Sequence, residues 1–214
     1  MGILFLALLG ISHVKLLLAA PPLEDYLVRF MANDRLICSG IIVNRRQILT
    51  AGYCKPDQHA ENFTLVFSDG STNTVTDSTV SQYYTAKESS DLLILLHLSK
   101  VLGEKFTNPP PICQYRPPTE HQVEYWSWNG NILQKKYTPQ STTLECRREI
   151  KDPEGVVIGN DIVCLKNMQY SEGCVKNFGI PFVWRNSFCG INILGHNCQI
   201  ASKADIFVRL RTTN

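Results

Sequence analysis

The segment CSGIIVNRRQILTAGYC, residues 38–54, holds two β-branched and aliphatic runs between two cysteines. Short runs of this kind, separated by turn residues, are typical of antiparallel strands rather than helices. We therefore predict strands at Leu36 to Val43 and at Ile48 to Ala51, and the same pattern recurs along the chain. Further strands are expected at Phe63 to Phe67, Asn73 to Val80, Leu92 to Leu98, Val156 to Ile158, Ile162 to Leu165, Pro181 to Trp184 and Gly190 to Leu194.

Turn residues and prolines divide this β-protein into two halves. Ser68-Asp69-Gly70-Ser71 predicts a hairpin turn between the strands at 63–67 and 73–80. A stretch with prolines at positions 109, 110, 111, 117 and 118 disfavours both a helix and a central strand, and it is the expected linker. We expect an N-terminal half over residues 21–112 and a C-terminal half over residues 113–214.

The composition is that of an ordinary folded protein. Of 214 residues, 44% are hydrophobic and 19% are charged, and the net charge is +2. Neither disorder nor nucleic-acid binding is indicated by such a balance. The eight cysteines are an even number spread over a chain that is long enough to bury a core, so we interpret them as disulfide-forming.

The first 20 residues, MGILFLALLGISHVKLLLAA, resemble a secretory signal peptide cleaved near Ala20. His13 and Lys15 interrupt the apolar run, which disfavours a permanent membrane anchor. We therefore expect a secreted, extracellular protein without membrane contact after cleavage, in an environment where cysteines pair. Asn62-Phe63-Thr64 is a glycosylation sequon, and Asn62 is its expected acceptor.

Several motifs in order resemble the trypsin and chymotrypsin family of serine proteases. The opening segment is similar to the family's C-G-G-x-L-I followed by W-V-L-T-A-A-H-C. The other matching motifs are DLLILL at 91–96, PIC at 111–113, YWSWNG at 125–130, CVKNFGIP at 174–181 and the segment 190–198. The resemblance implies two packed six-stranded antiparallel β-barrels. Because the chain stops at Asn214, soon after the expected last strand Asp205 to Leu210, the family's closing helix is expected to be missing.

The resemblance also assigns the catalytic positions, and two of the three hold the wrong residue type. The family uses a histidine as base, an aspartate that orients it and a serine nucleophile. These positions are Tyr53, Asp91 and Phe178. A phenol with a pKa near 10 does not accept a proton at neutral pH as imidazole does, and a phenylalanine has no nucleophilic atom. We expect no hydrolysis by the family mechanism.

Two further positions agree with lost catalysis. Lys176 replaces a glycine of the turn that supplies the oxyanion-binding N–H groups, and Asn177 replaces the aspartate that pairs with the new N-terminus on activation. The expected specificity pocket is also altered, and we interpret it as vestigial, with a retained pocket for basic residues as the alternative. Its positions are Glu172, Leu194, Gly195 and Asp205.

The resemblance implies three disulfides, Cys38–Cys54, Cys146–Cys164 and Cys174–Cys198. Elimination then pairs Cys113 with Cys189, with an intermolecular bond as the alternative. No Cys and His spacing resembles a zinc site, and no metal or cofactor is expected. His97 is expected to be a structural residue with a local hydrogen bond.

Three functions remain open from sequence. The first is a secreted, inactive serine protease homologue that acts as a cofactor, decoy or regulator by binding proteases, inhibitors or proteolytic substrates. The second is a structural or toxin-like component of a venom, saliva or reproductive fluid. The third is a serine-type endopeptidase with an altered active site.

Overall fold

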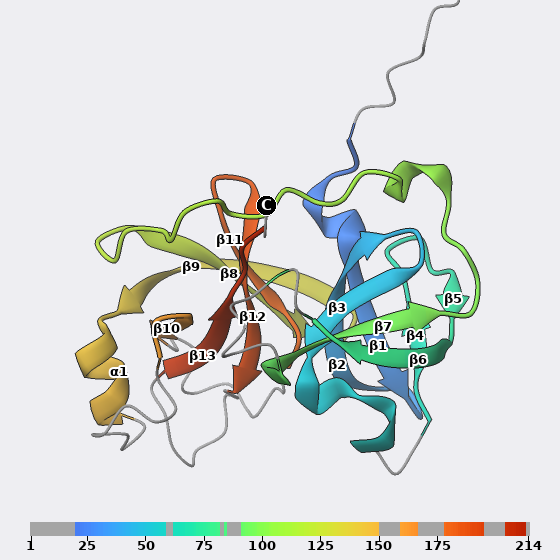
Figure 1. The fold of residues 1–214 in the computed structure, drawn as a ribbon, viewed down its shortest axis with the longest axis horizontal. Coiled ribbons are helices and arrows are strands. Elements are labelled where there is room, and N and C mark those ends of the chain that lie inside the picture. Colours follow the sequence, from blue (N-terminus) through green and yellow to red (C-terminus); the bar gives the residue numbers. More distant parts are fainter. Residues whose placement is uncertain are drawn as a thin grey trace, which may run out of the picture.

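The computed structural model describes residues 20–58, 62–81, 84, 91–149, 159–166, 178–194 and 204–212. Two β units lie side by side, the first built from the N-terminal half and the second from the C-terminal half (Figure 1). The prediction of a mostly β, chymotrypsin-like fold is confirmed. Only one α-helix occurs within the described ranges, α1 at Thr143–Glu149.

The first unit contains η1 (Leu23–Tyr26), β1 (Leu27–Ala32), β2 (Arg35–Asn44), β3 (Gln47–Ala51), η2 (Gly52–Cys54), η3 (Pro56–Gln58), β4 (Thr64–Val66), β5 (Thr72–Asn73), β6 (Val75–Val80) and β7 (Leu93–Leu98). The connection to the second unit carries η5 (Glu104–Phe106). The second unit contains β8 (Gln122–Asn129), β9 (Ile132–Ser141), α1, β10 (Ile162–Lys166), β11 (Pro181–Trp184), β12 (Ser187–Leu194) and β13 (Ala204–Arg209).

The first unit is a curled seven-stranded sheet and differs from the expected closed barrel of six strands. Its strand order is β5-β4-β1-β2-β3-β7-β6. The two edge strands, β5 and β6, are separated in the chain by Thr74 alone. The sheet must therefore curl until its edges meet at this residue, where the covalent chain joins them in place of a ladder of hydrogen bonds.

A buried asparagine holds the corner where these two edges meet. Asn73 is 5% exposed, and its amide nitrogen donates to the Lys100 carbonyl at 2.8 Å. Its side-chain oxygen accepts from the Thr74 N–H at 2.9 Å, the Ser99 hydroxyl at 2.7 Å and the Lys100 N–H at 3.1 Å. These four bonds satisfy polar groups that a sharp bend would otherwise leave unpaired.

The hairpin expected over residues 63–80 is only partly correct. β4 pairs with β5, so the turn at 68–71 joins neighbouring strands as predicted. β6 instead pairs with β7, with Thr79 opposite Leu95. The alternation of residues 73–80 indicates extended backbone, but it does not show that the chain changes partner after Asn73.

The second unit is a closed barrel of six strands, as expected, with the order β10-β13-β12-β11-β8-β9. Side chains inside it form a separate cluster that includes Val123, Tyr125, Phe182 and Phe207. β8 and β9 were not predicted as strands, although Asn129-Gly130 is a strong hairpin signal and Gly130 has the positive φ of 57° that such turns need.

The proline-rich connection docks on the second barrel through backbone hydrogen bonds. The Cys113 N–H donates to the Phe188 carbonyl, and the Phe188 N–H donates to the Pro111 carbonyl, both at 2.9 Å. The structure contains three of the four expected disulfides, Cys38–Cys54, Cys113–Cys189 and Cys146–Cys164. The fourth expected pair, Cys174–Cys198, and the strand expected at 156–158 lie outside the described residues.

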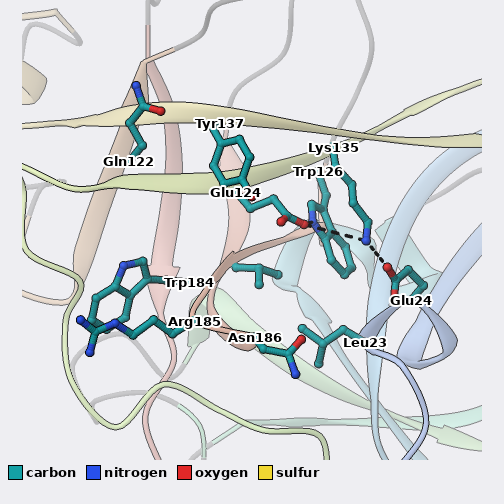
Figure 2. A pocket seen from close by; sticks show the side chains of 11 residues that line it. Leu23, Glu24, Gln122, Glu124, Trp126, Lys135, Tyr137, Trp184, Arg185 and Asn186 are labelled. Carbon is teal, nitrogen blue, oxygen red and sulfur yellow. Dashed lines mark hydrogen bonds and ion pairs between the residues drawn. The ribbon is translucent and has the colours of Figure 1, made fainter.

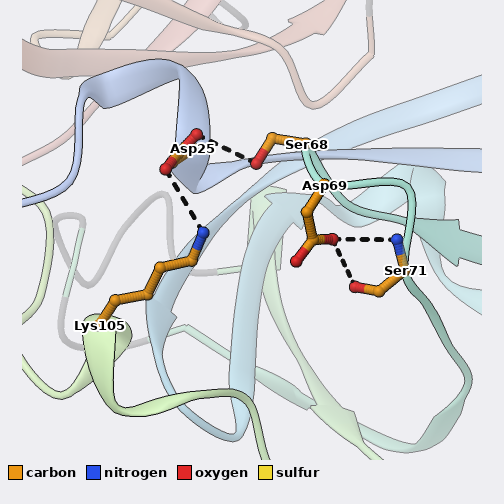
Figure 3. Close-up of polar contacts among 5 residues, drawn as sticks. All are labelled: Asp25, Ser68, Asp69, Ser71 and Lys105. Carbon is orange, nitrogen blue, oxygen red and sulfur yellow. Dashed lines mark hydrogen bonds and ion pairs between the residues drawn. The ribbon is translucent and has the colours of Figure 1, made fainter.

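Polar contacts fix the first short helix against the turn at 68–71 and against η5 of the connection (Figure 3). Asp25 of η1 accepts from the Ser68 hydroxyl at 3.1 Å and pairs with the Lys105 ammonium at 3.4 Å. Within the same turn at 68–71, the hydroxyl and the N–H of Ser71 both donate to the Asp69 carboxylate. These hydrogen bonds lower the pKa of the Asp69 carboxyl group. The beginning of the described chain is therefore anchored, and it carries Leu23 and Glu24 to the outer face of the second barrel.

Candidate functional site

Tyr53 lies directly after the end of β3, in the short helix η2. The Cys38–Cys54 disulfide ties this helix to β2. The Tyr53 side chain is 45% exposed, which is high for a large aromatic residue. Local structure thus presents Tyr53 on the surface, directly after β3.

Phe178 is held between the two units by backbone hydrogen bonds. The Ser39 N–H of β2 donates to the Phe178 carbonyl at 2.8 Å. The Gly179 N–H donates to the Asn192 carbonyl of β12 at 2.8 Å, and the Asn192 N–H donates to the Ile180 carbonyl at 2.9 Å. The segment that carries Phe178 therefore joins the first sheet to the second barrel.

Only glycine fits at the position that follows Phe178. Gly179 has a φ of +81°, in the left-handed region that side chains disfavour. A Cβ at this residue would lie 1.8 Å from the Ser39 carbonyl oxygen and 2.4 Å from the Thr50 hydroxyl. The close approach of three backbone segments thus fixes where the Phe178 side chain is presented.

The two aromatic rings lie against each other. The ring centroids of Tyr53 and Phe178 are 4.3 Å apart, with 29° between the ring planes. Such a stack contributes about 0.5–1.5 kcal/mol beyond the area it buries. The positions that the sequence assigned to a base and a nucleophile are therefore brought together, and an aromatic contact occupies them.

Asp91 is near these rings through its backbone, but its side chain is exposed. The Asp91 carbonyl oxygen lies against Gly52, where a Cβ would come within 2.9 Å of it. The resemblance places Asp91 at the position of the family's orienting aspartate, and the role of this position stays a prediction. A carboxylate is costly to bury without a donor, and no imidazole stands at position 53 to supply one.

A small polar network beneath the aromatic pair was not found by sequence reasoning. The Thr50 hydroxyl donates to the Ser39 carbonyl at 2.5 Å, and the Trp128 indole N–H donates to the Ser39 hydroxyl at 3.0 Å. Trp128 belongs to β8, so this bond links the second barrel to β2. The sequence motif YWSWNG contains Trp128. Its hydrogen-bond partner Ser39 lies 89 residues earlier in the chain, so this contact is seen only in the folded structure.

Asp205, one of the expected pocket residues, is a buried carboxyl group in the second barrel. It lies on β13 opposite Leu165, and it is 1% exposed. Burial raises the pKa of the Asp205 carboxyl from 3.8 to about 6, and the nearby Tyr125 hydroxyl offsets part of this shift. Neither carboxylate oxygen has a hydrogen bond of normal geometry within the described chain, so desolvation dominates.

Within the described residues, the structure gives no contact between Asp205 and the other three expected pocket positions. Glu172 and Gly195 lie outside the described residues, and Leu194 is described only as the last residue of β12. Whether these positions form a pocket stays a prediction. The same holds for Lys176 and Asn177, which also lie outside the described ranges.

Asn62 is exposed, as a glycan acceptor must be. His97 on β7 lies 3.1 Å from the Thr79 hydroxyl through its Nε2 atom, which is the local hydrogen bond expected for a structural histidine.

Across the residues with described positions, no group of three or more His, Cys, Asp or Glu side chains is placed to hold a metal. Within those same ranges, no helix is long and apolar enough to cross a bilayer.

A six-stranded barrel beside a curled sheet, with the Tyr53 and Phe178 positions meeting at their junction, defines the chymotrypsin-like fold. The trypsin family model matches residues 19–214, and the chain belongs to this family. It is 22% identical over 195 residues to seminase of Drosophila melanogaster, a match that covers 82% of this chain and 69% of seminase.

A solved structure agrees with this fold. The chain is similar to neuropsin, a serine protease expressed in the limbic system of mouse brain, with a TM-score of 0.66 and 19% identity. The similarity covers 87% of this chain and 90% of neuropsin. At this low identity the similarity shows the fold alone.

Proposed function

We propose that this chain is a secreted, catalytically inactive member of the trypsin family that acts by binding proteins. The observation that carries the proposal is the stack of Tyr53 on Phe178 at 4.3 Å. Neither side chain has a group that attacks a carbonyl or accepts a proton at neutral pH. The proposed partners are proteases, their inhibitors or proteolytic substrates, for which the chain serves as cofactor, decoy or regulator.

The surroundings of the stack support a binding role. Tyr53 is nearly half exposed, and aromatic residues that present a rigid, amphipathic surface are enriched in protein interfaces. The Cys38–Cys54 disulfide and the bonds of Ser39 hold both rings in place before any partner arrives. A surface that is ordered in advance loses less conformational entropy when it binds.

Secretion is part of the proposal and rests on two features. Three disulfides are present, and disulfides persist mainly in oxidising compartments. The first 20 residues have the pattern of a cleaved leader. N-terminal sequencing of the protein secreted from cultured animal cells tests this part, with a start near Pro21 expected.

A fluorophosphonate probe tests the absence of catalysis, because it labels an activated serine. We expect no labelling of the native protein, while an active trypsin-family enzyme in the same buffer is labelled. Labelling that disappears on denaturation would show an altered but working active site and refute the proposal.

The binding role is tested by affinity capture from the native secreted fluid with identification of the captured proteins. Proteases or protease inhibitors are expected on the wild-type protein and on Tyr115→Ala, a control at another exposed tyrosine. Tyr53→Ala should lose them. Equal capture by Tyr53→Ala and wild type would contradict a role for the aromatic pair, and recovery of neither class would favour a structural component of the fluid.

A further inference from the structure

A concave site lies on the outer face of the C-terminal barrel, where η1 of the first unit crosses β8, β9 and the β11–β12 turn (Figure 2). Its volume is about 320 Å³, within the range of small-molecule binding sites. The residues lining it are distinct from Tyr53 and Phe178. It is therefore a candidate for a binding activity that does not depend on the proposed function.

Strand register explains why the lining side chains converge. Glu124 on β8 is the cross-strand partner of both Tyr137 on β9 and Val183 on β11. Trp126, two residues along β8, is the partner of Lys135. Because residues two apart on a strand point to the same side, all five side chains share the outer face of the barrel.

The fixed charges of the pocket cancel one another. Lys135 donates a hydrogen bond to Glu24 and lies 3.9 Å from Glu124, and the Trp126 indole N–H donates to Glu124. The hydrogen bond from Lys135 lowers the pKa of Glu24, so this carboxylate is charged at neutral pH. With Arg185 as the second cation, two positive and two negative groups face the pocket, which favours a neutral ligand over an ion.

Aromatic surface is available beside these polar groups. Tyr137 is 68% exposed, and within the described chain its side chain makes no hydrogen bond. The Arg185 guanidinium lies 4.3 Å from the centre of the Trp184 ring and holds it in place. In Figure 2 the pair of Trp184 and Arg185 lies at one end of the pocket and the pair of Lys135 and Glu24 at the other, with Glu124 between them.

A peptide segment is a poorer fit than a small polar molecule. β8, β9 and β11 all belong to the closed barrel, and each is paired on both sides. No strand edge is therefore open here for an incoming strand to extend the sheet. A peptide would lack backbone partners and would depend on side-chain contacts alone.

We propose that this pocket binds a neutral pyranose sugar. The C–H face of a pyranose ring packs on an exposed aromatic ring such as Tyr137. Its hydroxyl groups exchange hydrogen bonds with planar polar side chains, which here are Glu124 and the exposed amides of Gln122 and Asn186. The absence of net charge in the pocket matches the absence of charge on such a ligand.

Saturation-transfer NMR with methyl hexopyranosides, followed by titration of the sugars that respond, tests the proposal on the secreted protein. A panel of neutral oligosaccharides distinguishes a free sugar from the end of a longer glycan. We expect binding to a neutral sugar that weakens at least tenfold in Tyr137→Ala. Tyr115→Ala, which removes a tyrosine of similar exposure on the connection between the units, should bind as wild type.

Binding by wild type that Tyr137→Ala loses while its unfolding midpoint is unchanged supports the proposal. No binding to any neutral sugar, binding only to sialylated or amino sugars, or equal binding by Tyr137→Ala and wild type would overturn it. Tyr53→Ala should retain full sugar binding, so failure of this site and failure of the aromatic pair are distinguishable.

Discussion

Replacing Asp205 by asparagine should stabilise the protein above pH 6. The side chain is 1% exposed, and burial raises the pKa of its carboxyl from 3.8 to about 6. Each pKa unit corresponds to about 1.4 kcal/mol, so ionised Asp205 costs the folded state about 3 kcal/mol. Asparagine has nearly the same shape and no charge, so Asp205→Asn removes this cost.

The direction of the pH dependence follows from the raised pKa. The folded protein holds the proton on Asp205 more tightly than the unfolded chain does. Below about pH 4 both states are protonated and the carboxyl group carries no charge penalty. The penalty develops between pH 4 and 6 and is complete above pH 6. The gain from Asp205→Asn should follow the same course, from near zero at pH 4 to about 3 kcal/mol at pH 8.

Urea unfolding with the disulfides intact, at pH 4 and at pH 8, measures this difference. Asp77→Asn on β6 is the matched control, since Asp77 is exposed and its replacement should change stability by less than about 0.5 kcal/mol at either pH. An Asp205→Asn variant that is no more stable than wild type at pH 8, or equally stabilised at both pH values, would refute the assignment of the penalty to a buried charge.

Further substitutions test the packing around the site. Gly179→Ala should lower the free energy of unfolding by at least about 3 kcal/mol, since its Cβ would lie 1.8 Å from the Ser39 carbonyl oxygen. Gly70 also has a positive φ but has open space around it, so Gly70→Ala should lower it by only about 1 kcal/mol in the same urea assay. Tyr53→Ala should lower unfolding stability by about 1–2 kcal/mol through loss of the ring stack, and an effect as small as that of Tyr115→Ala would contradict the stack. Asn73→Ala should cost about 2–4 kcal/mol because Lys100 and Thr74 N–H groups at the sheet corner lose their acceptor, and a neutral result would show that water replaces it. A Cys113→Ala and Cys189→Ala double variant should lose about 2–5 kcal/mol yet remain monomeric, and disulfide-linked dimers of wild type on a non-reducing gel would contradict the intramolecular pair.

Strand positions with clear alternation or long aliphatic runs were predictable from sequence. β2, β3, β7 and β11 lie within one residue of their predicted limits. β1, β8 and β9 were missed, the last two because their segments mix aromatic, charged and polar residues. That mixture arises because one face fills the barrel and the other meets solvent and η1, and the sequence shows both faces at once.

The candidate site was predictable as positions, through motifs shared with the trypsin family. The resemblance placed Tyr53 and Phe178 at the base and nucleophile positions, and the structure shows that their rings stack. The exposure of the Asp91 side chain was not predictable, because burial of a carboxylate depends on whether a donor faces it. The outer pocket was also hidden, since it needs the register of three strands and the path of η1.

The sequence by itself determined the β class, the even number of cysteines and the order of the motifs that resemble the trypsin family. These properties depend on residue type, local period and motif order, which the chain displays directly. Only the tertiary structure decided that the first sheet closes through Thr74, that Asp205 is buried with a raised pKa, and that Tyr137 lies opposite Glu124. Those features depend on contacts between residues distant in the chain, and such contacts arise only when strand partners and burial are fixed by packing.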